Sequence, residues 1–298
     1  MNYKWRELAF PLLVRTANLL PKRWLRKIPF VRKMWNSLHS AAIPDYPVLF
    51  NINGIKLFAN PNIHGVGWIL LVQGVYEPGT VDLFMKLLTR EGMVVVDLGA
   101  NVGYFTMVAA KLVGNSGKVY AFEPEPSNFE LLLRNIKLNG YTNVVPINKA
   151  VSNREGPGEL FISNHRTSES QIFKRENGSE IVPIESTSLD IFFNDRDHHI
   201  DVIKMDIEGA EELALHGMSS VLKNNQHIKI ITEFNPETLE KAGSSPKEYL
   251  TIFIELGFKL YRIDEERKSL ENISSPEAEI EALNRRIFSH YENILITR

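Results

Sequence analysis

Asp97-Leu98-Gly99-Ala100-Asn101-Val102-Gly103 is the stretch of sequence that decides the fold. It overlaps the end of Met93–Leu98, an apolar run interrupted by a single aspartate, which is typical of a parallel strand buried on both faces. It precedes Tyr104–Val113, which has the pattern of a helix. Gly99 permits a tight turn, and Gly103 lets the helix begin close to a ligand. The stretch therefore predicts a strand, a turn that contacts a ligand, and a helix.

Strand and helix patterns alternate around this unit. The further predicted strands are Lys118–Phe122, Val144–Val151, Val202–Met205, Ile228–Thr232, Phe258–Ile263 and Asn293–Thr297. The predicted helices are Thr80–Thr89 capped by Thr80, Ser127–Asn139 capped by Ser127, Ala210–Leu222, and Pro246–Leu256. A long polar connection without a strong helix of its own joins the last two strands. The pattern predicts a Rossmann-like α/β fold, a mostly parallel seven-stranded sheet with a C-terminal antiparallel hairpin.

The sequence divides into an arm, a domain and an insertion within that domain. We expect residues 1–47 to form a basic helical arm and residues 48–298 to form the Rossmann-like domain. The domain opens with a predicted hairpin, because Val48–Ile52 and Ile55–Ala59 flank an Asn-Gly pair. Residues 155–187 interrupt the alternation, and we interpret them as a β-arm insertion that covers a substrate site.

The arm has a charge unlike that of the remaining chain. Residues 1–40 contain nine Lys or Arg and one acid, whereas the remainder contains 25 bases and 35 acids. Three of the four tryptophans also lie in the arm, at Trp5, Trp24 and Trp35. One interpretation is that its helices pack on the main domain or on a second subunit of a homodimer. The other is peripheral contact with an anionic membrane, where basic residues and tryptophan are favoured.

The overall composition excludes several kinds of chemistry. The chain has 298 residues and no cysteine, which excludes disulfides, cysteine-ligated metals and a thiol nucleophile. Its net charge of −2 gives no reason to expect nucleic acid as a partner. No stretch has the length of about 20 apolar residues that a membrane span needs, and a secretory signal is not expected. We therefore expect a cytoplasmic protein, with peripheral contact at the inner membrane face if the arm binds lipid.

Two acids near strand ends and the spacing of the glycines favour S-adenosylmethionine over a nicotinamide cofactor. Asp97 stands where it would suit a ligand with a cationic amino-acid portion, such as S-adenosylmethionine. Glu123 follows the next strand, where a carboxylate can accept both hydroxyls of a ribose. Nicotinamide cofactors usually require G-x-G-x-x-G, and here Asn101 and Tyr104 replace two of the three glycines.

Four motifs together resemble the FkbM family of methyltransferases. They are Val96–Phe105, Ala121–Pro126, Lys149–Ser152 and Ile203–Glu211, and the order and spacing agree with the family. The resemblance covers about residues 76–235. It implies a class I methyltransferase fold, S-adenosylmethionine as cofactor, and O-methylation in polysaccharide, glycolipid or polyketide pathways. In this interpretation Gly99, Asn101, Gly103 and Ala150 join Asp97 and Glu123 around the cofactor, with Ala150 near the adenine.

The best candidates for acceptor chemistry follow the strand Val202–Met205. Asp206 would remove the proton of an acceptor hydroxyl or orient the acceptor, a role that contributes about 10²–10⁴ in rate. Glu208 would assist or would cap the next helix. His165, in the insertion, is an alternative base or a solvated loop residue.

Further polar residues offer a metal site or a second contact with the cofactor. Asp206, Glu233 and Asn235 present hard oxygen ligands that suit Mg²⁺, which would lower the pKa of an acceptor hydroxyl. The alternative for Glu233 is a hydrogen bond to a neighbouring loop. Glu77 would contact the ammonium group of the cofactor or cap the following helix.

Several functions remain open at this point. The leading hypothesis is O-methylation of a hydroxyl on a small-molecule or lipid-linked glycan acceptor. N-methylation uses the same pocket and needs less base catalysis. A nucleotide-binding protein without turnover, or a nicotinamide-dependent oxidoreductase, would retain the fold with a different chemistry.

Overall fold

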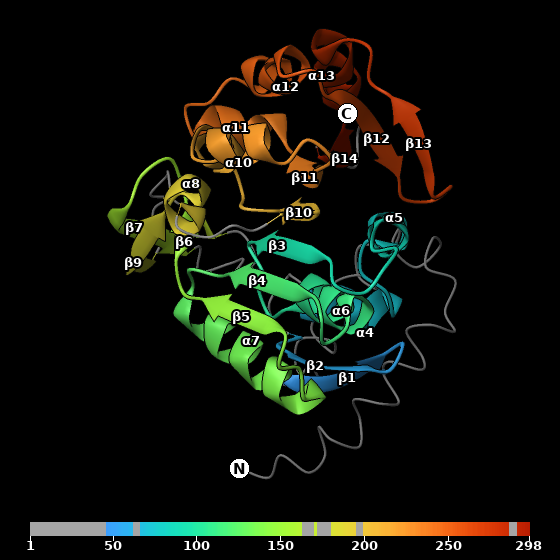
Figure 1. The fold of residues 1–298 in the computed structure, drawn as a ribbon, viewed down its shortest axis with the longest axis vertical. Helices are drawn as coiled ribbons and strands as arrows, with labels where there is room; N and C mark the ends of the chain where they lie inside the picture. Colours follow the sequence, from blue (N-terminus) through green and yellow to red (C-terminus); the bar gives the residue numbers. More distant parts are fainter. Residues whose placement is uncertain (1–45, 62–65, 163–169, 172–179, 195–198, 286–290) are drawn as a thin grey trace, which may run out of the picture. The chain divides into compact units, whose positions relative to one another are not determined.

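The computed structural model describes residues 46–61, 66–162, 170–171, 180–194, 199–285 and 291–298 (Figure 1). Residues 1–45, nearly all of the basic arm, and His165 lie outside these ranges. The chain forms two compact units, Met1–Tyr76 and Glu77–Arg298. Within the described residues, no helix is both long and apolar enough to cross a membrane.

The first unit contains the hairpin that its sequence predicts. Strands β1 (Val48–Ile52) and β2 (Ile55–Ala59) pair antiparallel around Asn53 and Gly54, which both have positive φ. Helix α4 (Val66–Gln73) follows and was not predicted. The Asn-Gly pair fits here because a two-residue hairpin turn of this kind needs left-handed backbone at both positions.

An eight-stranded sheet is the centre of the second unit. Its order is β13-β12-β14-β11-β10-β3-β4-β5. The strands are β3 (Val94–Leu98), β4 (Lys118–Phe122), β5 (Val144–Ile147), β10 (Val202–Met205), β11 (Lys229–Phe234), β12 (Lys259–Asp264), β13 (Ser269–Asn272) and β14 (Glu292–Thr297). The run from β5 to β11 is parallel, whereas β14 is antiparallel to both of its neighbours. This is the Rossmann-like class I methyltransferase topology with β13 added at one edge.

The helices of this unit connect the strands. They are α5 (Pro78–Leu87), α6 (Tyr104–Val113), α7 (Pro126–Asn139), α8 (Leu189–Phe193), α9 (Glu211–His216), α10 (Ser219–Asn224), α11 (Pro236–Lys241), α12 (Pro246–Glu255) and α13 (Pro276–Asn284). Helix α6 lies on one face of the sheet, where Phe105 contacts Lys204 of β10. Helices α8 and α12 lie on the other face, through ring contacts of Phe193 with Tyr120 and of Tyr249 with Phe234. The sheet is therefore covered on both sides (Figure 1).

The insertion after β5 forms a second, smaller sheet. Its strands are β6 (Ala150–Val151), β7 (Gly156–Ile162), β8 (Ser170–Gln171) and β9 (Glu180–Thr187), in the order β6-β9-β7-β8. Leu160 and Ile184 pack with Ala150 to make a small apolar core of its own. Within the insertion the sequence predicts strands at Glu159–Ile162 and Ile181–Ile184, and these lie inside β7 and β9.

Two predicted elements are broken in the structure. The strand predicted over Val144–Val151 leaves the main sheet after Ile147, because Asn148 turns and its Nδ2 donates to the backbone oxygen of Glu123 at 2.8 Å. The helix predicted over Ala210–Leu222 is divided into α9 and α10. A Cβ at Gly217, between them, would lie 2.1 Å from the backbone oxygen of Ser152, so the chain passes too closely there for a continuous helix.

The predicted helix caps were wrong at two positions. Thr80 lies inside α5, and its backbone N–H and hydroxyl both donate to Glu265. Helix α7 is capped by Glu125, whose carboxylate accepts from the backbone N–H groups of Ser127 and Asn128. In both cases a carboxylate replaces the expected hydroxyl, and negative charge at a helix N-terminus is stabilising.

The long connection before the last strand has more structure than its polarity predicts. It contains β13 and α13. Ser275 caps α13 by accepting from the backbone N–H of Ala278, and Pro276 occupies the first turn. Ser followed by Pro is a helix start pattern that the polar composition concealed.

Candidate functional site

The turn after β3 lies against the chain that leaves β10. Gly99, Asn101 and Gly103 all have positive φ, of 78°, 51° and 93°. A Cβ at Gly99 would lie only 1.9 Å from the backbone oxygen of Asp206. A Cβ at Gly103 would lie 2.6 Å from Leu132 of α7. Both glycines are therefore required by close approach as well as by conformation, and they bring the turn next to Asp206.

Glu123, directly after β4, holds this turn in place. Its carboxylate accepts the backbone N–H of Asn101 at 2.7 Å and that of Glu125 at 2.9 Å. Burial raises the pKa of Glu123 to about 8, and these two hydrogen bonds oppose the shift. A carboxylate has about four acceptor positions, so two remain for a ligand.

Asp97 and Ala150, both predicted to contact a cofactor, are buried. The Thr106 hydroxyl donates to Asp97 at 2.5 Å, and burial raises the pKa of Asp97 to about 6. Ala150 lies in β6, in the core of the small sheet. Asp97 thus anchors the start of α6, where Thr106 lies.

Lys204 is the central residue that sequence reasoning missed. Its side chain is 1% exposed, its Nζ has no hydrogen-bond partner among the described residues, and it lies 3.6 Å from Oδ2 of Asp206. The Nζ also lies 5.0 Å from the centre of the Phe105 ring. Burial alone would lower the pKa of Lys204, but the surrounding carboxylates, Asp206 foremost, raise it overall. A lysine within an apolar buried strand was the available clue, because such a residue is rarely buried without charge partners.

Three carboxylates meet beside Lys204. One oxygen from each of Glu77, Asp206 and Glu233 lies within 4.8 Å of the other two. Burial raises the pKa of Glu77 to about 7, and that of Glu233 well above its ordinary value. The sequence analysis predicted that Asp206 and Glu233 lie near one another, but it did not predict that Glu77 lies with them.

The remaining predicted residues take other positions. The Asn235 side-chain oxygen accepts the backbone N–H of Thr238 and so caps α11. Glu208 has a positive φ of 53°, and Ala210, not Glu208, is the N-cap residue of α9. The Glu233 carboxylate lies in the acid cluster with Glu77 and Asp206. Glu77 is the N-cap residue of α5, but its side chain makes no capping hydrogen bond.

Two residues near the last strand, Tyr291 and Asn293, complete the site and were not predicted. Asn293 lies opposite Glu233 in the antiparallel pair of β11 and β14, so both side chains point to the same face of the sheet. Asn293 also makes a side-chain hydrogen bond that lowers the pKa of Glu77, although burial dominates that shift. Burial, and then the negative charge of Glu233, raises the pKa of Tyr291. No sequence pattern reveals which residues will face each other across these strands.

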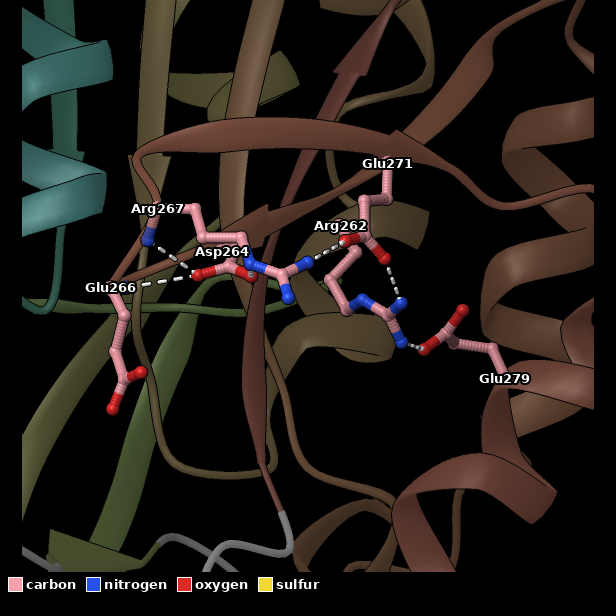
Figure 2. A network of polar contacts seen from close by, with 6 residues as sticks. All are labelled: Arg262, Asp264, Glu266, Arg267, Glu271 and Glu279. Atoms are coloured by element: carbon pink, nitrogen blue, oxygen red, sulfur yellow. Dashed lines mark hydrogen bonds and ion pairs between the residues drawn. The ribbon is translucent and has the colours of Figure 1, made fainter.

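A polar network stabilises the hairpin of β12 and β13, whose turn contacts α5 next to Glu77. In Figure 2, Arg262 of β12 bonds both Glu271 and Glu279, while Asp264 accepts the backbone N–H groups of Glu266 and Arg267. The turn fixed in this way contains Glu265. That carboxylate accepts the backbone N–H of Gly79 at 2.6 Å, beside Glu77. The hairpin thus stabilises the first turn of α5.

The fold and this polar edge together define the class of protein. Polar side chains and a glycine turn gather at the carboxyl ends of parallel strands, where ligands bind in open α/β sheets. With the strand order described above, this is the arrangement of a class I methyltransferase. Residues 97–260, more than half of the chain, match the model of the methyltransferase FkbM domain. The chain belongs to the FkbM methyltransferase family.

Individual relatives match over shorter segments. A protein-L-isoaspartate O-methyltransferase of Methanothrix thermoacetophila is 30% identical over 138 residues, 44% of this chain and 66% of that protein. A tRNA(Phe) (4-demethylwyosine(37)-C(7)) aminocarboxypropyltransferase of Methanocaldococcus jannaschii is 44% identical over 63 residues, 21% of this chain and 25% of that protein. The chain thus spans less than two thirds of the length of either relative.

Solved structures are similar at low sequence identity. The methyltransferase FkbM of Methylobacillus flagellatus has a TM-score of 0.44 and 15% identity, covering 70% of this chain and 44% of that one. A SAM-dependent O-methyltransferase of Thermotoga maritima has a TM-score of 0.42 and 14% identity, covering 88% of this chain and 81% of that one. The fold assignment rests on the strand order and the family match.

Proposed function

We propose that the protein is an S-adenosylmethionine-dependent methyltransferase that methylates a hydroxyl group of a sugar, a glycolipid or a polyketide-like acceptor. The observation that supports this most directly is the contact between the glycine turn after β3 and the backbone of Asp206. This contact brings a cofactor-binding turn and an acid at the next strand end to one place. Family membership supports the same reaction class.

The residues at the turn fit S-adenosylmethionine. Glu123 is fixed by two backbone N–H groups and retains acceptor positions for two ribose hydroxyls. Gly99 and Gly103 give the turn its left-handed backbone and let Asp206 and Leu132 lie close beside it. When bound, the cofactor supplies an electrophilic methyl group on its sulfonium centre.

In this proposal Asp206 activates the acceptor hydroxyl. It is partly exposed and lies 3.6 Å from the Lys204 ammonium, an ion pair that holds its orientation. As a base it would accept the proton of the acceptor hydroxyl, a contribution of about 10²–10⁴ in rate. A divalent cation such as Mg²⁺ beside Asp206 would lower the pKa of that hydroxyl. Glu208 follows Asp206 closely and would assist it.

The acid cluster also favours a second candidate, methylation of an amine. Glu77, Asp206 and Glu233 would attract a protonated amino group as well as a neutral alcohol. An amine acceptor needs less base catalysis because its free form has a nucleophilic lone pair. The two candidates therefore differ in how strongly the rate depends on Asp206.

We further propose that the acceptor is lipid-linked and that the basic arm contacts the membrane surface. Nine bases and three tryptophans within residues 1–40 support this, since both favour an anionic interface. In this proposal the protein is cytoplasmic and peripheral to the membrane. Packing of the arm on a second subunit is the competing arrangement.

Transfer of radiolabelled methyl groups tests the function. The protein would be incubated with labelled S-adenosylmethionine and separate pools of oligosaccharides, lipid-linked glycans, polyketides and amines. We expect labelled product from a hydroxyl-bearing pool, stable to base as an ether is. Label only in the amine pool would replace O-methylation with N-methylation. No product in any pool, despite cofactor binding, would favour a binding protein without turnover.

A further inference from the structure

The three carboxylates beside Lys204 come from three separate parts of the second unit. Glu77 precedes α5, Asp206 follows β10, and Glu233 lies near the end of β11. Their nearest oxygens are all within 4.8 Å of one another. Oxygens that share a cation at 2.3–2.6 Å lie up to about 5 Å apart, so this spacing suits a single bound ion.

Asn293 is a second and independent feature of the same place. The residue is 3% exposed, and its Oδ1 has no hydrogen-bond partner within the described part of the chain. The register places it opposite Glu233, and its side chain also reaches Glu77. A buried amide oxygen without a donor costs about 1–3 kcal/mol, and a metal ion would satisfy it.

Lys204 is the positively charged side chain beside four acids, Glu77, Asp97, Asp206 and Glu233. Within the described residues its ammonium donates no hydrogen bond. The Oε2 atom of Glu77 is buried and also lacks a partner among these residues. The cluster therefore has carboxyl oxygens available to a divalent cation, which would displace the proton of any carboxyl group that is protonated.

We propose that Glu77, Asp206 and Glu233 bind one divalent cation, with Oδ1 of Asn293 as a neutral oxygen ligand. Oxygen-only ligands select hard ions such as Mg²⁺, Mn²⁺ or Ca²⁺. Asn235, which the sequence suggested as a ligand, caps α11 instead. This inference rests on the proposed function for its purpose, because an ion here would bind an acceptor oxygen beside Asp206.

Manganese binding measured by electron paramagnetic resonance tests the site. Chelator-treated full-length protein would be titrated with Mn²⁺ alone, and Mg²⁺ would then be added as competitor. We expect one Mn²⁺ per chain, displaced by Mg²⁺. Glu233→Gln and Glu77→Gln should each weaken binding by about 10-fold or more. Glu255→Gln, which changes an exposed acid on α12, should leave it unchanged.

The same samples would be titrated with S-adenosylhomocysteine to separate the two proposals. Retained S-adenosylhomocysteine binding also shows that each variant is folded. If wild-type protein binds S-adenosylhomocysteine but no Mn²⁺, or if both variants bind Mn²⁺ like wild type, the cation site is wrong while the function stands. If the protein binds Mn²⁺ at this cluster but no S-adenosylhomocysteine, the proposed function is wrong while the cation site stands.

Discussion

The two faces of the central sheet are built from neighbouring residues of the same strands but have opposite character. In β10, Met205 joins the large apolar core under α8 and α12, whereas Lys204 points to α6 and the acids. In β11, Phe234 lies in that core, and Glu233 points to the acid cluster. One face is packed with apolar side chains, whereas the other buries Lys204 beside carboxyl groups.

The two faces differ in whether their buried polar groups have hydrogen-bond partners. On the apolar face the hydroxyl groups of Thr232 and Tyr249 satisfy each other at 2.9 Å. On the charged face Lys204 Nζ and Asn293 Oδ1 have no hydrogen-bond partner in the described residues. Since buried polar groups are usually paired, incomplete pairing on one face favours a ligand there. The stability of the charged face should also depend on pH.

The largest expected effect is that of Lys204→Met. Removing the ammonium leaves buried carboxylates without a counter-charge, at a cost of about 3–5 kcal/mol in the free energy of unfolding. The loss should be greater at pH 8 than at pH 5, because protonation neutralises the carboxylates at low pH. Urea unfolding at both pH values measures it.

Met205→Ala is the matched control on the apolar face. Deleting this buried side chain should cost about 2–5 kcal/mol by leaving a cavity. This loss should be the same at pH 5 and pH 8, since no charge changes. Equal pH dependence of the two variants would contradict the distinction between the faces.

Asp206→Asn should mainly affect turnover. We expect methyl transfer to fall by about 10²–10⁴, while affinity for S-adenosylhomocysteine stays within about 3-fold of wild type. Rate measurements with labelled cofactor and calorimetry on the same protein separate the two quantities. A rate unchanged by the substitution would remove Asp206 from the role of base and favour an amine acceptor.

Cofactor binding should depend on pH through Glu123. Burial raises its pKa from 4.5 to about 8, so folding favours the protonated form and its contribution to stability is lost as pH rises from about 4.5 to 8. Ribose hydroxyls donate to the carboxylate, so binding should release a proton and strengthen between pH 6 and 8. Calorimetry in buffers of different ionisation enthalpy measures that release. Glu123→Gln should reduce it, and an unchanged release would show that another group titrates.

The smallest effect should come from Tyr249→Phe on the apolar face. It removes one hydrogen bond at a cost of about 1 kcal/mol, and the Thr232 hydroxyl keeps its bond to the Glu233 backbone oxygen at 3.0 Å. Affinity for S-adenosylhomocysteine should not change. Thermal unfolding and calorimetry check both statements, and a large loss of affinity would mean that the two faces are coupled through β11.

Local patterns predicted much of the parallel half of the sheet. The bounds of α6, β4 and β10 are those expected, because each has a clear period and a glycine or polar boundary. The C-terminal edge was harder, since β13 is short and polar and α13 begins within a polar segment. The acids at strand ends were predictable one by one. Their grouping with Glu77, Lys204 and Asn293 was not, because strand register and the path of α5 depend on contacts distant in sequence.

The most direct test of the account is calorimetric titration with S-adenosylhomocysteine, using NADH as the comparison. The account predicts micromolar binding of S-adenosylhomocysteine and none of NADH at pH 8. Glu123→Gln should weaken this binding by about 10-fold, the loss of about 1.4 kcal/mol expected for a charge-assisted hydrogen bond, and Glu255→Gln should leave it unchanged. Binding of NADH alone, or of neither ligand, would contradict the assignment of the turn after β3 and of Glu123 to S-adenosylmethionine.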